Sequence, residues 1–262
     1  MSRALGTWPP RLAAWVLIPV LGVMLRLAPL VGPPGNTWTF DAAGHYRLVA
    51  ELVVHGRLST PDRFTDLPEG RSLGRFLPLG FYHAAAAWHR LAAGFGARDL
   101  DLNLEVLMAL FGALVAWPVW GAARALGAHP WAAAFAALVA VLVPAHLQRT
   151  TGFLLRYEGL GTLLATTHMA LAAAALGARA TRPALARSAL SALALLAALA
   201  TWRVTLVVPA LETAIVLALA VARPPTMALR IWVTAQALGL AAAALLLEYL
   251  RAQTFLLSPM VL

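Results

Sequence analysis

The 262-residue sequence contains neither cysteine nor lysine. Without cysteine the chain cannot form a disulfide framework or a thiolate metal site. Without lysine all 20 basic residues are arginine, and the formal net charge is +9. In a soluble protein that charge would suggest nucleic acid, but only 12% of these residues are charged. We therefore interpret the arginines as topology signals and as binders of lipid headgroups or phosphate, and we expect no nucleic-acid partner.

Apolar residues make up 61% of the chain, and its mean hydropathy is +0.77. Several apolar runs are long enough to cross a hydrocarbon core of about 30 Å. The runs cover residues 12–32, 104–126, 131–147, 158–178, 185–202, 204–222 and 229–250. The sequence therefore predicts an all-α membrane protein of about seven transmembrane helices, embedded in a lipid bilayer.

Acidic residues are missing from alternate connections between these runs. If the N-terminus is cytoplasmic, the inner connections carry arginine and no acid, as the positive-inside rule expects. The arginines concerned are Arg3, Arg11, Arg124, Arg179, Arg182, Arg187, Arg223 and Arg230. The acids fall on the outer side, except Glu212, which lies within an apolar run. We expect an integral protein of the cell membrane with its N-terminus inside.

The longest connection, residues 33–103, is predicted to be the first external loop. It holds most of the acids and includes the semi-apolar stretch "FLPLGFYHAAAAWHRLAAGF". Aromatic and cationic side chains in that stretch suit a helix lying in the membrane interface better than an eighth span. They are Tyr82, His83, Trp88, His89 and Arg90. A loop of this length among short connections is typical of a functional segment.

Asp41 is the first candidate functional residue of this loop. The stretch "TFDAAGHYRLVAELVVHGRL" predicts a helix that follows Asp41 and ends near Gly56. An aspartate at a helix start can simply cap it by accepting backbone N–H bonds. Alternatively, its carboxylate is a hard oxygen ligand for Mg²⁺ or Mn²⁺, or accepts a proton or hydrogen bond from a substrate nucleophile. Both interpretations remain open on the spacing alone.

The second candidate is the stretch "LQRTTGFLLRYEGLGTLL", which places Arg149 and Arg156 just before Glu158 at the start of an apolar run. In a purely structural interpretation, the arginines reach lipid headgroups and Glu158 favours the positive end of the helix dipole. In a functional one, guanidinium groups bind the phosphate of a lipid-linked substrate beside a carboxylate.

Three stretches in this order resemble the catalytic subunits of oligosaccharyltransferases, which are membrane glycosyltransferases of the C-type superfamily. "FDAAGHYRLVAELVVHGRLSTPDRFTDLPEGRSLGRFLPLGFYHAAAAWHRL" is similar to their first external loop. "VPAHLQRTTGFLLRYEGLGTLL" is similar to their second acidic motif, and "ATWRVTLVVP" to a later turn between two spans. The resemblance covers roughly residues 12–222.

The resemblance implies roles for single residues. Asp41 takes the place of the family's first metal-site and acceptor-site carboxylate, and Glu158 that of its second catalytic and metal-site acid. Arg149 matches the family's arginine, and His45 and Trp202 are expected on the substrate side. A divalent cation, Mg²⁺ or Mn²⁺, would be the cofactor. Two features depart from the pattern: Arg156 stands where the family has an aspartate, and residues 42–44 replace an aromatic pair.

The implied function is transfer of a sugar or oligosaccharide from a polyprenyl-(pyro)phosphate carrier to an acceptor, most simply asparagine of a protein. Residues 1–262 would form a single transmembrane module that lacks the family's C-terminal spans and soluble domain. We expect a partner chain or further sequence to supply them.

Three alternatives remain open at this stage. One is a glycosyltransferase that uses a polyprenyl monophosphate and modifies lipid or glycan. Another is a non-catalytic relative, favoured by Arg156. The third is a transporter, because an acid within a span, here Glu212, is a functional candidate by default. Pairing of Glu212 with an arginine such as Arg203, or contact with an aqueous cavity, would equally explain that acid.

Overall fold

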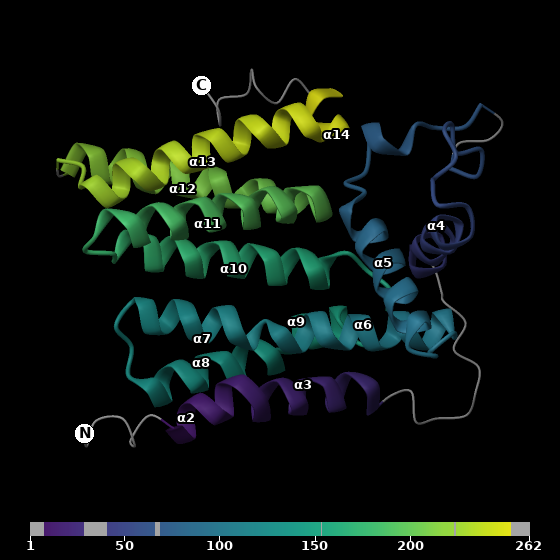
Figure 1. Ribbon diagram of the computed structural model, residues 1–262, viewed down its shortest axis with the longest axis horizontal. Coiled ribbons are helices and arrows are strands. Elements are labelled where there is room, and N and C mark those ends of the chain that lie inside the picture. The colour runs from purple at the N-terminus through teal and green to yellow at the C-terminus, as the bar shows by residue number, and fades with distance from the viewer. Residues whose placement is uncertain (1–7, 29–40, 66–68, 153, 223, 253–262) are drawn as a thin grey trace.

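The computed structural model describes residues 8–28, 41–65, 69–152, 154–222 and 224–252 (Figure 1). Regular structure within these ranges is helical, without a β-strand, and an isolated bridge pairs Asp62 with Arg71. The all-α prediction is therefore confirmed for the described part of the chain.

Six helices in the described residues are long and apolar enough to cross a membrane. Three of them are made of consecutive helical segments. The first joins α2 (Trp8–Leu12), η1 (Ala13–Leu17) and α3 (Ile18–Leu27), and the second joins α6 (Leu100–Leu114) and α7 (Ala116–Ala125). The third joins η4 (Arg203–Leu206) and α12 (Val207–Ala222). The others are α10 (Glu158–Leu176), α11 (Thr181–Thr201) and α13 (Met227–Leu246). This set is compatible with an integral membrane protein.

The predicted span at residues 131–147 forms two shorter helices, α8 (Pro130–Leu142) and α9 (Pro144–Arg149). Pro144 has no N–H to continue the helix, and Val143 before it adopts an extended ψ of 127°. With 13 residues, α8 is shorter than the roughly 20 that a hydrocarbon core requires. The described part of the chain thus has six long apolar helices and, beside them, the bent pair α8 and α9.

The long helices run side by side, and α4 (Asp41–His55) and α5 (Gly80–Gly94) lie at one end of this bundle (Figure 1). That end is where α3 and α11 finish and where α6 and α10 begin (Figure 1). The predicted helix after Asp41 matches α4, which stops before Gly56 because Gly56 has a φ of +73°. The short helix α14 (Glu248–Ala252) follows α13 at the same end.

An apolar core fixes α4 and α5 to the bundle. Leu52 of α4, Phe81 of α5 and Met108 of α6 are all fully buried in one cluster. Tyr82 is buried there too, and Trp88 donates a hydrogen bond from Nε1 to the carbonyl of Asn103 at 2.8 Å. Aromatic residues expected at a membrane interface therefore pack against protein, which holds the N-terminus of α4 in a defined position.

Candidate functional site

Four charged side chains from two distant segments meet at this end of the bundle. Asp41 is the first residue of α4 and Glu158 the first of α10, while Arg149 ends α9 and Arg156 lies just before α10. Arg156 Nη2 lies 3.5 Å from Asp41 Oδ2, and Arg156 Nη1 lies 3.4 Å from Glu158 Oε1. Arg149 Nη1 lies 3.5 Å from the same Glu158 oxygen. We call these four residues the charge cluster.

Arg156 occupies the centre of the charge cluster, because one guanidinium contacts both carboxylates. The side chains of Arg156 and Glu158 are mostly buried, at 22% and 17% exposure, whereas Asp41 and Arg149 are 71% and 55% exposed. Contacts of 3.4 to 3.5 Å between partly exposed groups are weak ion pairs, worth about 0–1 kcal/mol each. The cluster can therefore exchange partners at low cost.

Two atoms of the charge cluster have unused hydrogen-bonding capacity. Arg156 Nε and Glu158 Oε2 are buried and have no hydrogen-bond partner within the described structure. A buried polar atom without a partner costs about 1–3 kcal/mol, so such atoms point to a water or a ligand that completes the site. One atom is a donor and the other an acceptor, so a molecule with both an oxyanion and a hydroxyl group would satisfy both.

His45 lies one helical turn after Asp41 on α4, on the same face. Its Nδ1 is 2.8 Å from the hydroxyl of Tyr82, and its ring packs edge-on to Tyr157 with centroids 5.1 Å apart. Burial lowers the pKa of His45, while Glu158 and Asp41 act in the opposite direction and Arg156 lowers it again. The imidazole is therefore neutral at pH 7 and can accept or donate one hydrogen bond.

Burial also raises the pKa of the Tyr82 hydroxyl, which the negative charge of Glu158 raises further. The pKa of Tyr157 is raised in the same way, first by burial and then by Glu158. Both phenols stay protonated. The partly exposed rings of His45 and Tyr157 therefore form a neutral aromatic wall beside the charge cluster, with the buried Tyr82 behind them. Such a wall suits the uncharged face of a sugar or the first units of a lipid chain.

Trp202 follows α11 and packs on α10 one turn after Glu158. A Cβ built on Gly161 would lie 2.5 Å from Trp202 Cβ, so the glycine is what lets the indole approach. Trp202 is thus placed against the start of α10, next to the charge cluster, and fixes the distance between α10 and α11 there.

Arg26 is a buried residue that the sequence analysis did not select. Its side chain, near the end of α3, is fully buried and makes three hydrogen bonds. Nε donates to Thr150 Oγ1 at 2.7 Å, Nη2 to the carbonyl of Val141 at 3.0 Å and Nη1 to that of Gly22 at 3.1 Å. Arg26 thereby ties the ends of α8 and α9 to α3 and positions the segment that carries Arg149. A single arginine inside an apolar run was the available signal.

The side chains present do not fit a divalent cation in this arrangement. The guanidinium of Arg156 lies between the two carboxylates, where a bridging metal would have to sit, and like charges exclude one another there. Among the described residues no group of three or more His, Asp or Glu side chains could hold a metal. We therefore derive no step through Mg²⁺ or Mn²⁺.

Glu212 has a histidine as its partner, and not Arg203, which was one of the alternatives that the sequence left open. Its Oε1 lies 2.7 Å from Nε2 of His168 on α10. Arg203 sits on η4, toward the end of the bundle that carries the charge cluster. The side chain that contacts Glu212 is therefore a buried histidine and not the arginine.

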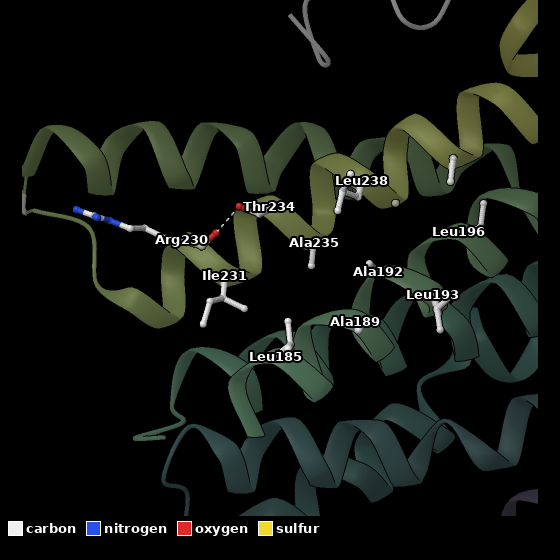
Figure 2. A pocket seen from close by; sticks show the side chains of 12 residues that line it. Leu185, Ala189, Ala192, Leu193, Leu196, Arg230, Ile231, Thr234, Ala235 and Leu238 are labelled. Carbon is white, nitrogen blue, oxygen red and sulfur yellow. Dashed lines mark hydrogen bonds between the residues drawn. The ribbon is translucent and has the colours of Figure 1, made fainter. Parts of the chain in front are cut away.

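An apolar groove and a more polar pocket are found among the described residues outside the charge cluster. A groove of about 610 Å³ runs between α11 and α13 and is lined by apolar side chains such as Leu185, Leu193 and Leu238, with Arg230 extending away from it (Figure 2). A pocket of about 390 Å³ lies near the charge-cluster end, where His83 and Glu248 face it. The groove offers no acid or base for chemistry, whereas the pocket has both.

Comparison with known proteins gives no assignment: no family model matches the sequence, and no curated protein matches it.

Proposed function

We propose that this chain is a membrane glycosyltransferase module that uses a polyprenyl-phosphate or pyrophosphate sugar donor. The observation that carries the proposal is the charge cluster: Arg156 joins Asp41 to Glu158, with Arg149 beside it. Two guanidinium groups and two carboxylates in one place can bind a phosphate and an acceptor at once. The resemblance of these stretches to oligosaccharyltransferase catalytic subunits supports the same proposal.

The proposed topology has seven crossings, with α8 and α9 together forming a bent one, and a cytoplasmic N-terminus. Arg124, Arg179 and Arg182 lie at the bundle end opposite α4 and α5, which suits an inner face. The charge cluster would then lie on the outer face, at the depth of the lipid headgroups. A polyprenyl carrier dissolved in the bilayer presents its phosphate at that depth.

Phosphate binding in this proposal proceeds by exchange of ion partners. Guanidinium forks bind phosphate oxygens in pairs, and more strongly than they hold an exposed carboxylate. Arg149 and the exposed Asp41 make weak contacts, so an arriving phosphate takes over Arg149 and Arg156 without breaking a strong bond. The unpartnered Arg156 Nε adds a further donor.

Release of Arg156 to the phosphate leaves Asp41 free to orient the acceptor. The acceptor nucleophile forms a bond to the anomeric carbon while the bond from that carbon to the phosphate oxygen breaks. The phosphate leaves with the bonding electron pair, and the arginines stabilise its charge. The proton lost by the nucleophile passes to the Asp41 carboxylate and then to solvent. The acceptor would be a protein or a glycan, and a partner chain could present it.

Sugar transfer by the full chain in lipid nanodiscs tests the proposal, with short-chain polyprenyl monophosphate and pyrophosphate sugars offered as separate donors. Asp41→Asn should lower turnover about 100-fold or more, the size expected for losing a positioned catalytic carboxylate. Glu69→Gln, at an exposed acid in the same external segment, is the matched control. Full turnover by Asp41→Asn would refute the proposed mechanism.

A second candidate function is a non-catalytic protein that binds polyprenyl phosphates. The observation that favours it is the pairing of both carboxylates with arginine, because the four charges of the cluster cancel. Donor binding without transfer, in both the parent and Asp41→Asn, would decide for this candidate.

A further inference from the structure

The apolar groove between α11 and α13 lies apart from the charge cluster and has no role in the proposed sugar transfer. Small side chains form its floor, and a Cβ built on Gly239 would lie 3.1 Å from Ala192 Cβ, so the two helices approach closely there. Larger side chains form its walls, among them Leu185, Leu193 and Leu238, each more than half exposed. The groove therefore opens outward from the bundle and not into its core.

The groove is long and narrow. It extends from Leu185 to Leu196 on α11 and from Ile231 to Ala242 on α13, which at 1.5 Å per residue is roughly 16 Å. Its volume of about 610 Å³ spread over that length makes it about 7 Å across. An α-helix with its side chains is about 10–12 Å across, so a helix of a second copy cannot enter it. A single hydrocarbon chain is thin enough, and one half of a hydrocarbon core of about 30 Å is about as long as the groove.

One end of the groove is positively charged. Arg230 is exposed there, and its side chain extends away from the apolar lining toward the start of α13 (Figure 2). Helix α11 begins at the same end of the bundle and carries Arg182 and Arg187, which are also exposed (Figure 1). Residues 177–190 and 222–235 contain no aspartate or glutamate. This end of the groove is therefore complementary to an anionic headgroup.

The opposite end of the same helix pair has mixed charge. Ala200 and Leu246 lie one turn beyond the last groove residues of their helices and line the pocket that Glu248 faces. Glu248 Oε1 lies 3.8 Å from Arg75 Nε, so an acid and a base already pair there. An anionic headgroup is therefore favoured at the Arg230 end.

We propose that the groove binds an anionic phospholipid, with one acyl chain between α11 and α13 and the phosphate at Arg230. Lipid tails are as apolar as leucine, so the chain alone gives little preference for one lipid over another. The preference comes from the headgroup, because a guanidinium forms charge-assisted hydrogen bonds with phosphate oxygens. Arg182 and Arg187 on the same end repel the cationic group of a zwitterionic lipid and attract a lipid with net negative charge.

Native mass spectrometry of the full chain in detergent micelles tests the proposal, with phosphatidylglycerol and phosphatidylcholine of identical acyl chains as probes. The parent should bind the first phosphatidylglycerol about tenfold more tightly than the first phosphatidylcholine. Arg230→Gln should lose most of this preference. Arg124→Gln, at an exposed arginine of α7 at the same end of the bundle, should keep it.

Filling the groove tests where the acyl chain lies. Ala189 is an exposed alanine that lines the groove, so Ala189→Phe places a ring in the path of the chain and should weaken phosphatidylglycerol binding about tenfold. Ala132→Phe, at an exposed alanine of α8 outside the groove, should bind like the parent.

Equal affinity of the parent for the two lipids would overturn the proposal, as would parent-like phosphatidylglycerol binding by Ala189→Phe. The same spectra report the oligomeric state. A parent dimer that Ala189→Phe converts to a monomer, without any lipid preference, would instead make the groove a contact between two copies and would also contradict the proposal.

Discussion

Arg156 Nη2 lies 3.5 Å from Asp41 Oδ2, although 115 residues separate the two in sequence. This contact joins the start of α4 to the start of α10 and brings Glu158 to the other side of the same guanidinium. Together with Arg149, which pairs with Glu158, the Arg156 guanidinium balances the charge of the two carboxylates, and it can turn to an incoming anion.

The first prediction concerns topology. Ala97 and Ala180 are both exposed alanines in connections, one beside α5 and one before α11, and the parent chain has no cysteine. In membrane vesicles of known orientation, an impermeant thiol reagent should label Ala97→Cys from the outer face and Ala180→Cys from the inner face only. Labelling of both from one side would contradict the proposed crossings.

The second prediction concerns the contact between Gly161 and Trp202. Gly161→Ala places a Cβ 2.5 Å from Trp202 Cβ, so α10 and α11 must separate or the indole must move. Such overpacking costs about 1–3 kcal/mol, which should appear as a lower thermal midpoint in detergent.

Gly121→Ala is the matched control, because Gly121 is also in a helix and its Cβ would meet nothing within 4 Å. There the substitution should stabilise by about 0.5–1 kcal/mol through helix propensity. Equal effects of the two substitutions would show that the indole does not pack against α10 as described.

The third prediction concerns Arg26. Arg26→Leu removes the donors for Thr150, Val141 and Gly22, and a buried acceptor without a partner costs about 1–3 kcal/mol. The thermal midpoint should fall strongly, and the segment carrying Arg149 should exchange amide hydrogens faster. Arg11→Leu, at an exposed arginine of the same span, should do neither.

The fourth prediction concerns pH and Asp62, which is 1% exposed. Burial raises its pKa, but hydrogen bonds from Arg47, Thr65 and the Phe64 N–H outweigh that effect and lower the pKa below its ordinary value of 3.8. A lowered pKa means that Asp62 stabilises the folded segment above about pH 3.8 and that this contribution is lost as pH falls through the folded pKa.

Asp62→Asn should therefore speed proteolysis of residues 57–65 at pH 7, and the difference from the parent should shrink as the pH falls below about 3.8. Glu69→Gln, at an exposed acid, should leave the rate unchanged. A difference between parent and Asp62→Asn that is independent of pH would show that the charge of Asp62 is not what holds the segment.

Helix positions were predictable from the sequence to the extent that they depend on local pattern. Long apolar runs produced the six long helices, and the helix that begins at Asp41 ends at His55, just before Gly56, as its sequence indicates. The division at Pro144 was not predicted, although its local signal was present. The burial of Tyr82 on α5 was missed because it depends on partners in α4 and α6, which no local pattern reveals.

The sequence was enough to select the four residues of the charge cluster as candidates, but it did not show which arginine would pair with which carboxylate. Arg156 was expected beside Glu158, but its contact with Asp41 depends on how α4 sits on the bundle. Arg26 carried a sequence signal that was not used. The partner of Glu212 could not be read from the sequence, because it depends on how α10 and α12 are rotated toward each other.

Binding of a polyprenyl phosphate to the full chain in nanodiscs is the most direct test that Arg156 serves the phosphate. Arg156→Ala should weaken binding about tenfold or more, since a charge-assisted hydrogen bond to phosphate contributes about 1.5–3 kcal/mol. Arg98→Ala, at an exposed arginine between α5 and α6, should bind like the parent, and chelation of divalent cations should change neither result. Equal affinity of the parent and Arg156→Ala would contradict the account.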